Sequence, residues 1–596
     1  MTNTIIIDGN TIYDYFISGA KRLIGSERNL NSINVFPVAD GDTGTNLALT
    51  MKMIILKSKK NKNLNDTLSS ISETAIENAY GNSGMIFAQF LNGFFIETKA
   101  KESITSKEFA EVARKAAGHA YNAVGSPKEG TILSVMRDWA NELSRALDSL
   151  DFEKGINDSV EKARVFVEKT KYKMKVFVEN NVVDAGAKAF LIFLEGMHEF
   201  LKKGKVDENY TTDYIELEAH ENTLKNVEVE KNRYCSQFYI ETKHETEDIK
   251  KAIVELGDSF VITSKDNHVK IHIHTDSPDV IMAELEKKGT VISQKIEDMK
   301  LMNGIIHNRK NKIGIVTDSI ADITQEMIDE NQITVIPMNL VCDSTLYLDK
   351  ITMTPDYFYK KLNEYKMNPT SAQPSSAVIE KTFEMLLEHF DSIIGIFVSK
   401  KMSGTYNSAS KVAKRLSKKG KRISVIDSKL NSNAEGLLVA EAARLAGEDL
   451  PHNEIVDRLE KTKENTRIFV SLKDLGPMIK GGRISKTAGM VLSKIKLQPV
   501  VSIDSNGKGI VYKKTLSQKA AVKKILDDIK RDKKESGILK YSIVYSDSKE
   551  DIKEFTQQLK KTIGFDPSYI APISPVIGLN SGNGAFAISY IKGGKT

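Results

Sequence analysis

The stretch Asn34-Val-Phe-Pro-Val-Ala-Asp-Gly-Asp-Thr-Gly-Thr-Asn46 is the part of the sequence from which we interpret the rest. At its centre, Asp40 and Asp42 lie one residue apart with a glycine between them. Side chains at i and i+2 of an extended or turning segment point the same way, and two such carboxylates repel unless a cation lies between them. Mg²⁺ prefers oxygen ligands that it shares with phosphates, and glycines let backbone N–H groups approach an anion. The stretch therefore predicts a Mg²⁺–phosphate loop, with an ordinary Asp-Gly surface turn as the alternative.

Length and composition indicate a multidomain globular protein. The chain has 596 residues, of which 40% are hydrophobic and 28% charged, enough for about three or four domains. Its net charge of +6 is mild at this length and gives no case for nucleic acid as a partner. Cys235 and Cys342 are the only cysteines, which favours a reducing compartment over a disulfide framework. The N-terminus lacks a signal-peptide pattern, and no stretch reaches the ~18 apolar residues of a membrane span. We therefore expect a cytoplasmic protein without an integral membrane segment.

Residues 1–200 have the periodicity of helices, interrupted by glycine-bearing loops. Asn10 is expected to cap the first helix, and a helix that opens at Asn46 would direct its N-terminal dipole toward a phosphate. Three further loops break the pattern, each a weak signal alone because helix bundles need polar turns anyway. These loops are Gly81-Asn82-Ser83-Gly84, Lys128-Glu129-Gly130-Thr131 and Asp184-Ala185-Gly186-Ala187.

Taken with the Asp loop, these phrases resemble the nucleotide-binding domain (DhaL-like, DAK2) of dihydroxyacetone kinases, in the version found in bacterial fatty acid kinases. The resemblance implies an all-α bundle over residues 1–203 that binds ATP and Mg²⁺ at one end. It implies that Asp40 and Asp42 are catalytic through the Mg²⁺ they hold. The first metal-ligand position of dihydroxyacetone kinases has no unambiguous Asp in this sequence, and Asn34 is the candidate for that third ligand. The ATP-binding residues that it implies are Thr43, Asn46, Asn82, Ser83, Gly84, Thr131 and Asp184.

Residues 213–308 are expected to form a small α+β domain after a charged linker at residues 202–212. Strand alternation over residues 269–274 points Lys270, His272 and His274 to one side. Cys235 lies on another predicted strand, and a cysteine with two histidines can supply three Zn²⁺ ligands with an open fourth position. The alternative is a polar sheet face with solvated histidines. The segments 234–238 and 270–275 resemble the middle domain of fatty acid kinases, which favours Zn²⁺ binding by these three residues.

From residue 311 onward, apolar strands that end in Ser or Asp alternate with helices. This pattern predicts an α/β domain with a mainly parallel sheet, whose ligand lies beyond the carboxyl ends of the strands. The strands are expected at residues 313–317, 393–398, 423–426, 467–470 and 542–545.

Four polar loops in this region lie at residues 369–375, 401–406, 479–485 and 578–584. They resemble those of the two-lobed DegV family of fatty-acid-binding proteins, and the likeness extends to the C-terminus. The resemblance implies that Ser371, Ser403, the Gly404 N–H and Arg483 bind a fatty acid carboxylate. An arginine can meet a carboxylate with two hydrogen bonds, and Arg483 is also expected to assist catalysis. The family's usual Thr-Ser-Gln-Pro contains Ala372 here, and its usual His in the Gly-x-His-Thr-Gly loop is Asn580. Asn580 can donate a hydrogen bond but carries no charge.

The resemblances together imply a fatty acid kinase that makes acyl phosphate from ATP and a bound fatty acid, for a downstream acceptor enzyme of phospholipid synthesis. Transfer can take place within one chain or between the two chains of a homodimer. Two other functions stay open. One is a lipid-binding sensor that binds ATP without transfer, which Asn580 would mark. The other is a kinase for a small polyol or ketone, although nothing in the sequence resembles the partner domain that such kinases need.

Overall fold

The structure is a computed structural model that describes residues 5–36, 41–149, 151–204, 231–343, 345–418, 420–482, 497–547 and 549–593. Two residues of the predicted sites, Asp40 and Arg483, lie outside the described residues, as does most of the predicted linker. The chain divides into two compact units, Met1–Lys300 and Leu301–Thr596. Helix α13 (Met299–His307) spans the division.

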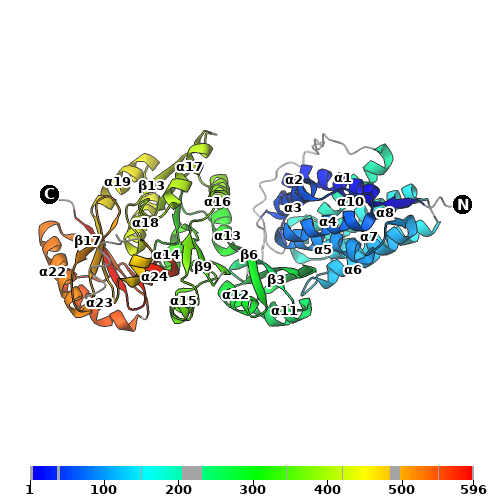
Figure 1. The fold of residues 1–596 in the computed structure, drawn as a ribbon. Helices are drawn as coiled ribbons and strands as arrows, with labels where there is room; N and C mark the ends of the chain where they lie inside the picture. Colours follow the sequence, from blue (N-terminus) through cyan, green and yellow to red (C-terminus); the bar gives the residue numbers. More distant parts are fainter. Residues whose placement is uncertain are drawn as a thin grey trace. The chain divides into compact units, whose positions relative to one another are not determined.

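The N-terminal part of unit 1 is a helical bundle (Figure 1). Among the described residues its helices are α1 (Gly9–Gly25), α2 (Glu27–Ser32), α3 (Thr43–Lys57), α4 (Leu64–Glu77), α5 (Gly81–Glu97), α6 (Ser106–Asn122), α7 (Ile132–Ser149), α8 (Phe152–Thr170), α9 (Lys175–Asn180) and α10 (Ala185–Lys203). A short antiparallel pair, β1 (Ile6–Asp8) with β2 (Ser103–Thr105), is a small departure from the expected all-α bundle. Aromatic rings fill the core, where Phe90, Trp139 and Phe190 pack edge to face.

The first helix begins earlier than the sequence suggested. Asp8, not Asn10, is its N-cap, because the Asp8 carboxylate accepts hydrogen bonds from the backbone N–H and the hydroxyl of Thr11. An aspartate is as good an N-cap as an asparagine, and here it satisfies two donors at once. The prediction of the helix is confirmed and that of its cap is wrong.

The second part of unit 1 is a four-stranded antiparallel sheet in the order β4-β5-β3-β6, accompanied by α11 (Thr246–Ile253), the short η1 (Val254–Leu256) and α12 (Pro278–Glu286). The strands are β3 (Tyr234–Thr242), β4 (Asp258–Lys265), β5 (His268–Thr275) and β6 (Gly289–Asp298). Strands β4 and β5 form a hairpin with a turn at Asp266 and Asn267, and Asp266 has a φ of 51°. We call this part the middle sheet.

The middle sheet contacts the helical bundle through specific polar groups. The Lys265 ammonium donates to the backbone carbonyl of Ser69 on α4 over 2.8 Å, and Asn92 on α5 donates to the carbonyl of Ser264 over 3.2 Å. The hydroxyl of Thr263 also donates to the side chain of Gln89 on α5. These contacts satisfy buried donors on both sides, so one face of the middle sheet is covered by α4 and α5.

Unit 2 contains three sheets among its described residues. A four-stranded parallel sheet has the order β13-β12-β7-β8, a six-stranded sheet has the order β16-β15-β14-β19-β17-β18, and a small antiparallel sheet has the order β10-β9-β11. The strands are β7 (Ile313–Asp318), β8 (Thr334–Ile336), β9 (Asn339–Cys342), β10 (Thr345–Leu348), β11 (Thr370–Ala372), β12 (Ser392–Phe397), β13 (Ile423–Asp427), β14 (Thr466–Ser471), β15 (Val500–Ile503), β16 (Gly509–Lys513), β17 (Ile538–Tyr545), β18 (Tyr569–Pro572) and β19 (Phe586–Lys592).

The helices of unit 2 lie between these strands in sequence and pack on the sheets (Figure 1). They are α14 (Gln325–Asn331), α15 (Pro355–Lys361), α16 (Ser376–His389), α17 (Thr405–Ser417), α18 (Ser432–Gly447), α19 (His452–Glu464), α20 (Gly476–Lys480), α22 (Gln518–Ser536), η2 (Glu550–Ile552), α23 (Lys553–Ile563) and α24 (Pro575–Ser581). The α/β prediction is confirmed, but the mainly parallel sheet holds only for the first lobe. In the described part of the six-stranded sheet, every strand pair except β17 with β18 is antiparallel. Short apolar strands look alike in either direction, so their periodicity could not separate the two sheets.

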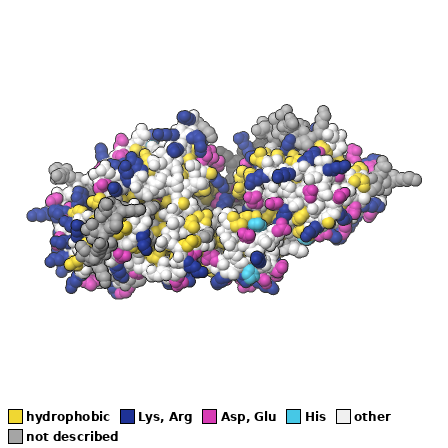
Figure 2. Space-filling view, viewed as in Figure 1, with side chains coloured by type: hydrophobic (Ala, Val, Ile, Leu, Met, Phe, Trp, Pro, Cys, Tyr) yellow, Lys and Arg dark blue, Asp and Glu magenta, His cyan; other side chains and the backbone are white. Residues whose placement is uncertain are grey.

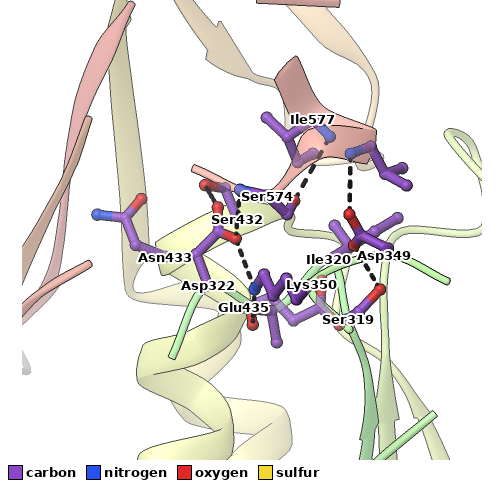
Figure 3. A network of polar contacts seen from close by, with 12 residues as sticks. Ser319, Ile320, Asp322, Asp349, Lys350, Ser432, Asn433, Glu435, Ser574 and Ile577 are labelled. Carbon is purple, nitrogen blue, oxygen red and sulfur yellow. Dashed lines mark hydrogen bonds and ion pairs between the residues drawn. The ribbon is translucent and has the colours of Figure 1, made fainter. Parts of the chain in front are cut away.

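A buried polar network fixes the loops that surround the start of α24 (Figure 3). Asp322, after β7, accepts from the Ser574 N–H over 3.0 Å and pairs with the Lys350 ammonium over 2.8 Å. Asp349 accepts from the Val576 N–H over 3.1 Å. Buried carboxylates need such partners, so the network determines where α24 begins.

No described helix is long and apolar enough to cross a membrane. The surface charge is mixed. On the face drawn in Figure 2, basic and acidic side chains are interspersed over the described residues of both units. On this face neither sign of charge dominates (Figure 2).

Candidate functional site

The prediction of a helix after the Asp loop is confirmed, but α3 begins at Thr43, before the predicted start at Asn46. Asp42 is the N-cap residue of α3, and its carboxylate accepts a 2.7 Å hydrogen bond from the Asn46 amide one turn later. Asn34 is buried, and its side-chain oxygen accepts a 2.8 Å hydrogen bond from the Thr43 hydroxyl. The structure thus brings Asn34, Asp42, Thr43 and Asn46 together at one helix N-terminus, where the dipole favours anions.

The second loop lies against the first. Gly81 opens α5 with a φ of 61°, and a Cβ added there would lie 2.5 Å from the Asn46 amide nitrogen. A Cβ at Gly84 would lie 2.8 Å from the hydroxyl of Thr50 on α3. Both positions therefore need glycine, because the start of α5 approaches α3 too closely for a side chain. Between them, Asn82 has a buried side-chain oxygen without a hydrogen-bond partner among the described residues, and Ser83 is half-buried.

The third and fourth loops are joined by Asp184. Its Oδ2 accepts from the Ile132 N–H of α7 over 3.0 Å and from the Ala187 N–H of α10 over 2.7 Å. Burial raises the pKa of Asp184 to about 6, although these two N–H groups act in the opposite direction. Thr131, the residue before α7, is buried and donates to the Lys128 carbonyl over 2.8 Å. Asp184 therefore holds two helix N-termini in register.

An aromatic contact connects the two pairs of loops. Phe36, two residues beyond Asn34, packs edge to face on Phe177 of α9 with ring centroids 5.9 Å apart. Helix α9 in turn immediately precedes the segment that carries Asp184. The loop contacts described above thus link the four predicted loops into one region of the bundle.

Cys235, His272 and His274 come together on the middle sheet. Cys235 on β3 lies opposite His274 on β5, and its sulfur is 4.0 Å from His272 Nε2. One ligand atom from each of the three residues lies within 4.8 Å of the others. Both histidines are buried, so the alternative of a solvated face is wrong. Burial lowers the pKa of His274 to about 4 and that of His272 well below its usual value, with His274 as a further cause for the latter. Burial therefore favours the neutral form of both rings, which is the form that binds a metal.

Two lysines that sequence reasoning did not select share this region. Burial, followed by the charge of Lys295, lowers the pKa of Lys270 to about 8. For Lys295, burial acts to lower the pKa, but the Glu297 carboxylate, Cys235 and Asp42 raise it above the usual value. The alternation Lys270-Ile-His-Ile-His274 placed Lys270 on the histidine side, whereas β6 gave no signal for Lys295.

A cavity in unit 2 is mostly apolar. It encloses about 820 Å³, a volume that includes space at its open mouth. Its apolar lining is Ile320, Met338, Val398, Met402, Ile468, Val470, Leu472, Met478, Val501, Ile503, Val576 and Ile577. The predicted residues Ser371, Ser403 and Asn580 all line the same cavity.

The loops around these polar residues are tightly fitted. A Cβ at Gly404 would overlap the Gln373 side-chain oxygen, so this glycine lets the Ser403 loop approach the Ser371 loop. The Ser403 hydroxyl lies 2.8 Å from that of Thr405 at the start of α17. Asn580 lies on α24, and a Cβ at Gly481 would overlap its side-chain oxygen.

Sequence reasoning missed three polar residues of the cavity lining, Asn431, Ser502 and Ser581. The Ser502 hydroxyl donates to the Ile468 carbonyl over 2.6 Å, and the side-chain oxygen of Asn431 is buried without a hydrogen-bond partner among the described residues. Ser581 stands in the Gly-rich phrase that carried the DegV resemblance, whereas no pattern indicated Asn431.

Three family models match separate parts of the chain. The DAK2 domain matches residues 37–199, the FakA-like middle domain of fatty acid kinases matches residues 231–304, and the model described as an uncharacterised protein of the DegV family matches residues 312–593. Uncharacterized proteins of Staphylococcus aureus strains USA300 and NCTC 8325 are 29% identical over 335 residues. The match covers 53% of this chain and 61% of the length of these curated relatives.

Solved structures similar to this chain include DegV, a fatty acid binding protein from Bacillus subtilis, with a TM-score of 0.43 and 25% identity. A DegV family protein from Thermus thermophilus, described by its fatty acid binding, has a TM-score of 0.44 and 23% identity. Each match covers 47% of this chain and 99% of the other.

The fold and the family models define a multidomain protein with a kinase-type helical domain. More particularly, the chain joins a DAK2 domain, a FakA-like middle domain and a DegV domain in one polypeptide. The resemblances drawn from the sequence are confirmed at this level.

Proposed function

We propose that the chain is an ATP-dependent fatty acid kinase that transfers the γ-phosphoryl group of ATP to the carboxylate of a fatty acid bound in unit 2. The observation that carries the proposal is that one chain has both a region suited to a nucleotide phosphate and a cavity suited to a fatty acid. Unit 1 has clustered helix N-termini beside carboxylate and amide oxygens, and unit 2 has an apolar cavity with hydroxyl groups in its lining. We propose domain boundaries at residues 1–203, 213–308 and 311–596.

In unit 1, the oxygen-only donor set of Asp42 and Asn34 suits Mg²⁺, and these residues, with Asp40, would hold it. Bound Mg²⁺ supplies neutralisation of phosphate charge. The hydroxyl of Thr43 and the amide of Asn46 border that position. The buried Asn82 oxygen has no hydrogen-bond partner among the described residues, which supports a ligand at this point.

The start of α5 completes the phosphate side. Ser83 and Gly84 follow Asn82 in its first turn, where backbone N–H groups have no helical acceptor and can bind an anion. Thr131 is proposed to lie near the nucleoside. Asp184 acts as a positioning residue, because its Oδ2 is engaged by the N–H groups of α7 and α10.

On the middle sheet, the sulfur and nitrogen donors of Cys235, His272 and His274 suit Zn²⁺. The three residues would hold it with one position open, and bound Zn²⁺ supplies positive charge. His272 Nδ1 is buried and unpartnered among the described atoms, which fits a ring that awaits a ligand or a water molecule.

In unit 2, we propose that Ser371, Ser403, the Gly404 N–H and Asn580 bind the fatty acid carboxylate, with Arg483, while the acyl chain fills the apolar cavity. A carboxylic acid has a pKa of about 4–5, so the nucleophile is already ionised at neutral pH and needs no general base. Its oxygen forms a bond to the γ-phosphorus as the bond from that phosphorus to the β–γ bridging oxygen breaks. ADP leaves with the electron pair, and acyl phosphate remains.

The test is a hydroxylamine trap for acyl phosphate, run on the full chain with ATP, Mg²⁺ and a long-chain fatty acid. We expect acyl hydroxamate and ADP in equal amounts from the wild type, and at least a hundredfold less from Asp42→Asn, since loss of a metal-holding charge removes several kcal/mol of transition-state stabilisation, about 3 or more. Asp66→Asn, an exposed acid on α4, is the matched control and should react like the wild type. No hydroxamate from lipid-loaded wild type overturns the proposal.

The alternative function, a lipid-binding sensor that binds ATP without transfer, has one specific observation in its favour. Asn580 cannot carry charge, whereas the usual family residue at this position, His, can. The sensor predicts that wild type binds ATP and lipid without making hydroxamate, and that Asn580→His begins to make it. Product from wild type contradicts the sensor. ADP formation that depends on dihydroxyacetone or glycerol, with no dependence on fatty acid, would instead support a small-polyol or ketone kinase.

A further inference from the structure

Two lysines of the middle sheet lie over one aromatic ring at the start of α5. Lys270 Nζ is 5.9 Å and Lys295 Nζ is 5.6 Å from the centroid of the Tyr80 ring. Tyr80 directly precedes Gly81, the first residue of α5. The face of an aromatic ring attracts cations at such distances, so Tyr80 gathers both ammonium groups beside the proposed phosphate loop.

The sheet register places these lysines with the Cys/His/His group. His272 on β5 lies opposite Gln237 on β3, which lies opposite Lys295 on β6. The three residues form one row across the sheet, and residues in register share a face. Lys270 lies two residues before His272 on the same strand, so it shares that face as well. Lys295 also interacts electrostatically with Asp42.

Both lysines also have a protein partner, and Lys270, like Lys265, attaches the sheet to α4. Lys265 donates to a backbone carbonyl and a hydroxyl of Ser69 and so attaches the sheet to α4. Lys270 donates to the Glu77 carbonyl over 2.8 Å, and Lys295 pairs with Glu297 over 2.7 Å. An ammonium group has three N–H donors, and these contacts use one donor on each lysine, so both can also donate to a bound anion.

We propose that Lys270 and Lys295 bind the terminal phosphates of the nucleotide, so that the middle sheet completes a site that the helical bundle begins. The inference rests on the proposed function for the identity of the anion, a nucleoside triphosphate. An ammonium group is a compact charge that binds phosphate oxygens and lowers the repulsion met by an approaching carboxylate. The middle sheet then contributes directly to nucleotide affinity and to transfer.

The test measures equilibrium binding of MgATP, MgADP and adenosine to the full chain, without fatty acid. Lys270→Met and Lys295→Met remove the charge and keep the side-chain length, Lys295→Arg keeps the charge, and Lys265→Met is the matched control from the same sheet. Loss of a hydrogen bond between charged groups corresponds to about a tenfold to hundredfold change. We expect a loss of that size for MgATP in both Met variants, a smaller loss for MgADP, and no change for adenosine. Lys295→Arg and Lys265→Met should stay within about threefold of wild type, because the first retains the charge and the second alters contacts with α4 and with the Phe95 ring of α5, away from Tyr80.

The outcomes separate this inference from the kinase proposal. Folded Met variants, checked by circular dichroism, that bind MgATP as wild type does would overturn the inference, as would an equal loss for MgATP and adenosine. Lysine-dependent MgATP binding in a wild type that makes no acyl hydroxamate would leave the inference standing while the kinase proposal fails. Wild-type hydroxamate yield at sub-saturating ATP from both Met variants would overturn the inference and leave the kinase proposal standing.

Discussion

Replacing Gly81 by alanine should disturb the Asp loop from a neighbouring helix. Gly81 has a φ of 61°, and an added Cβ would lie 2.5 Å from the Asn46 amide nitrogen. A side chain in the left-handed region costs roughly 1–2 kcal/mol. Asn46 must also move away, which breaks its 2.7 Å hydrogen bond to the Asp42 carboxylate, and a bond to a charged group contributes about 1.5–3 kcal/mol. We therefore expect Gly81→Ala to lower the free energy of unfolding of the helical bundle by about 2.5–5 kcal/mol.

The chain offers both a reporter and a control for this measurement. Trp139 is the only tryptophan and is buried in the bundle on α7, so its fluorescence follows urea unfolding of this part of the chain. Gly118 lies within α6 with no atom within 4 Å of an added Cβ, and Gly118→Ala should raise stability by up to about 1 kcal/mol. MgATP affinity should fall in Gly81→Ala and stay unchanged in Gly118→Ala. A Gly81→Ala protein with wild-type stability and wild-type MgATP affinity would refute the reasoning.

Three further predictions concern other parts of the chain. The pKa of Asp184 is raised from 3.8 to about 6. Its contribution to the free energy of unfolding is therefore full below pH 3.8 and is lost as the pH rises through about 6. A pKa shift of about two units corresponds to about 3 kcal/mol. Asp184→Asn should abolish this dependence, measured as the difference in urea unfolding from wild type at pH 4 and pH 8, and parallel profiles would contradict it. The wild type should contain about one Zn²⁺ per chain by elemental analysis, and Cys235→Ser should lose it while Cys342→Ser retains it; equal zinc in all three contradicts the site. Ser403→Ala should weaken fatty acid binding by about 1.5–3 kcal/mol, whereas Ser502→Ala should not, because the Ser502 hydroxyl already donates to the Ile468 carbonyl; equal effects in a lipid-binding titration would contradict the placement of the carboxylate.

Local patterns predicted most of the helical bundle and the histidine strand. Where two helices approach closely, as at Gly81, only glycine fits, so the position can be recognised in the sequence. The alternation around His272 likewise fixed which side chains share a face. The sequence did not reveal that this face is buried against α4 and α5, since burial depends on a partner surface distant in the chain. The solvated-histidine alternative stayed open for that reason.

Other features depend on tertiary contacts that no short pattern encodes. Lys295 becomes notable only because β6 pairs with β3 and places it in the row of His272. Asn431 becomes a cavity residue through the packing of loops from both lobes. The second sheet of unit 2 could not be separated from the first because strand direction is set by connections between elements, not by composition.

The substitution at Asn580 bears on where the charge for the proposed transfer would come from. A fatty acid carboxylate is ionised at neutral pH, so the proposed reaction would need positive charge near the γ-phosphate more than a base. Asn580 can only donate a hydrogen bond, and its side chain is held against Gly481. Lys270 and Lys295, whose ammonium groups lie beside the proposed phosphate loop, can provide charge from the middle sheet instead. An uncharged residue at position 580 is then compatible with the proposed transfer. The charge-removing variants of these two lysines should lower the yield of acyl phosphate more than Asn580→His raises it.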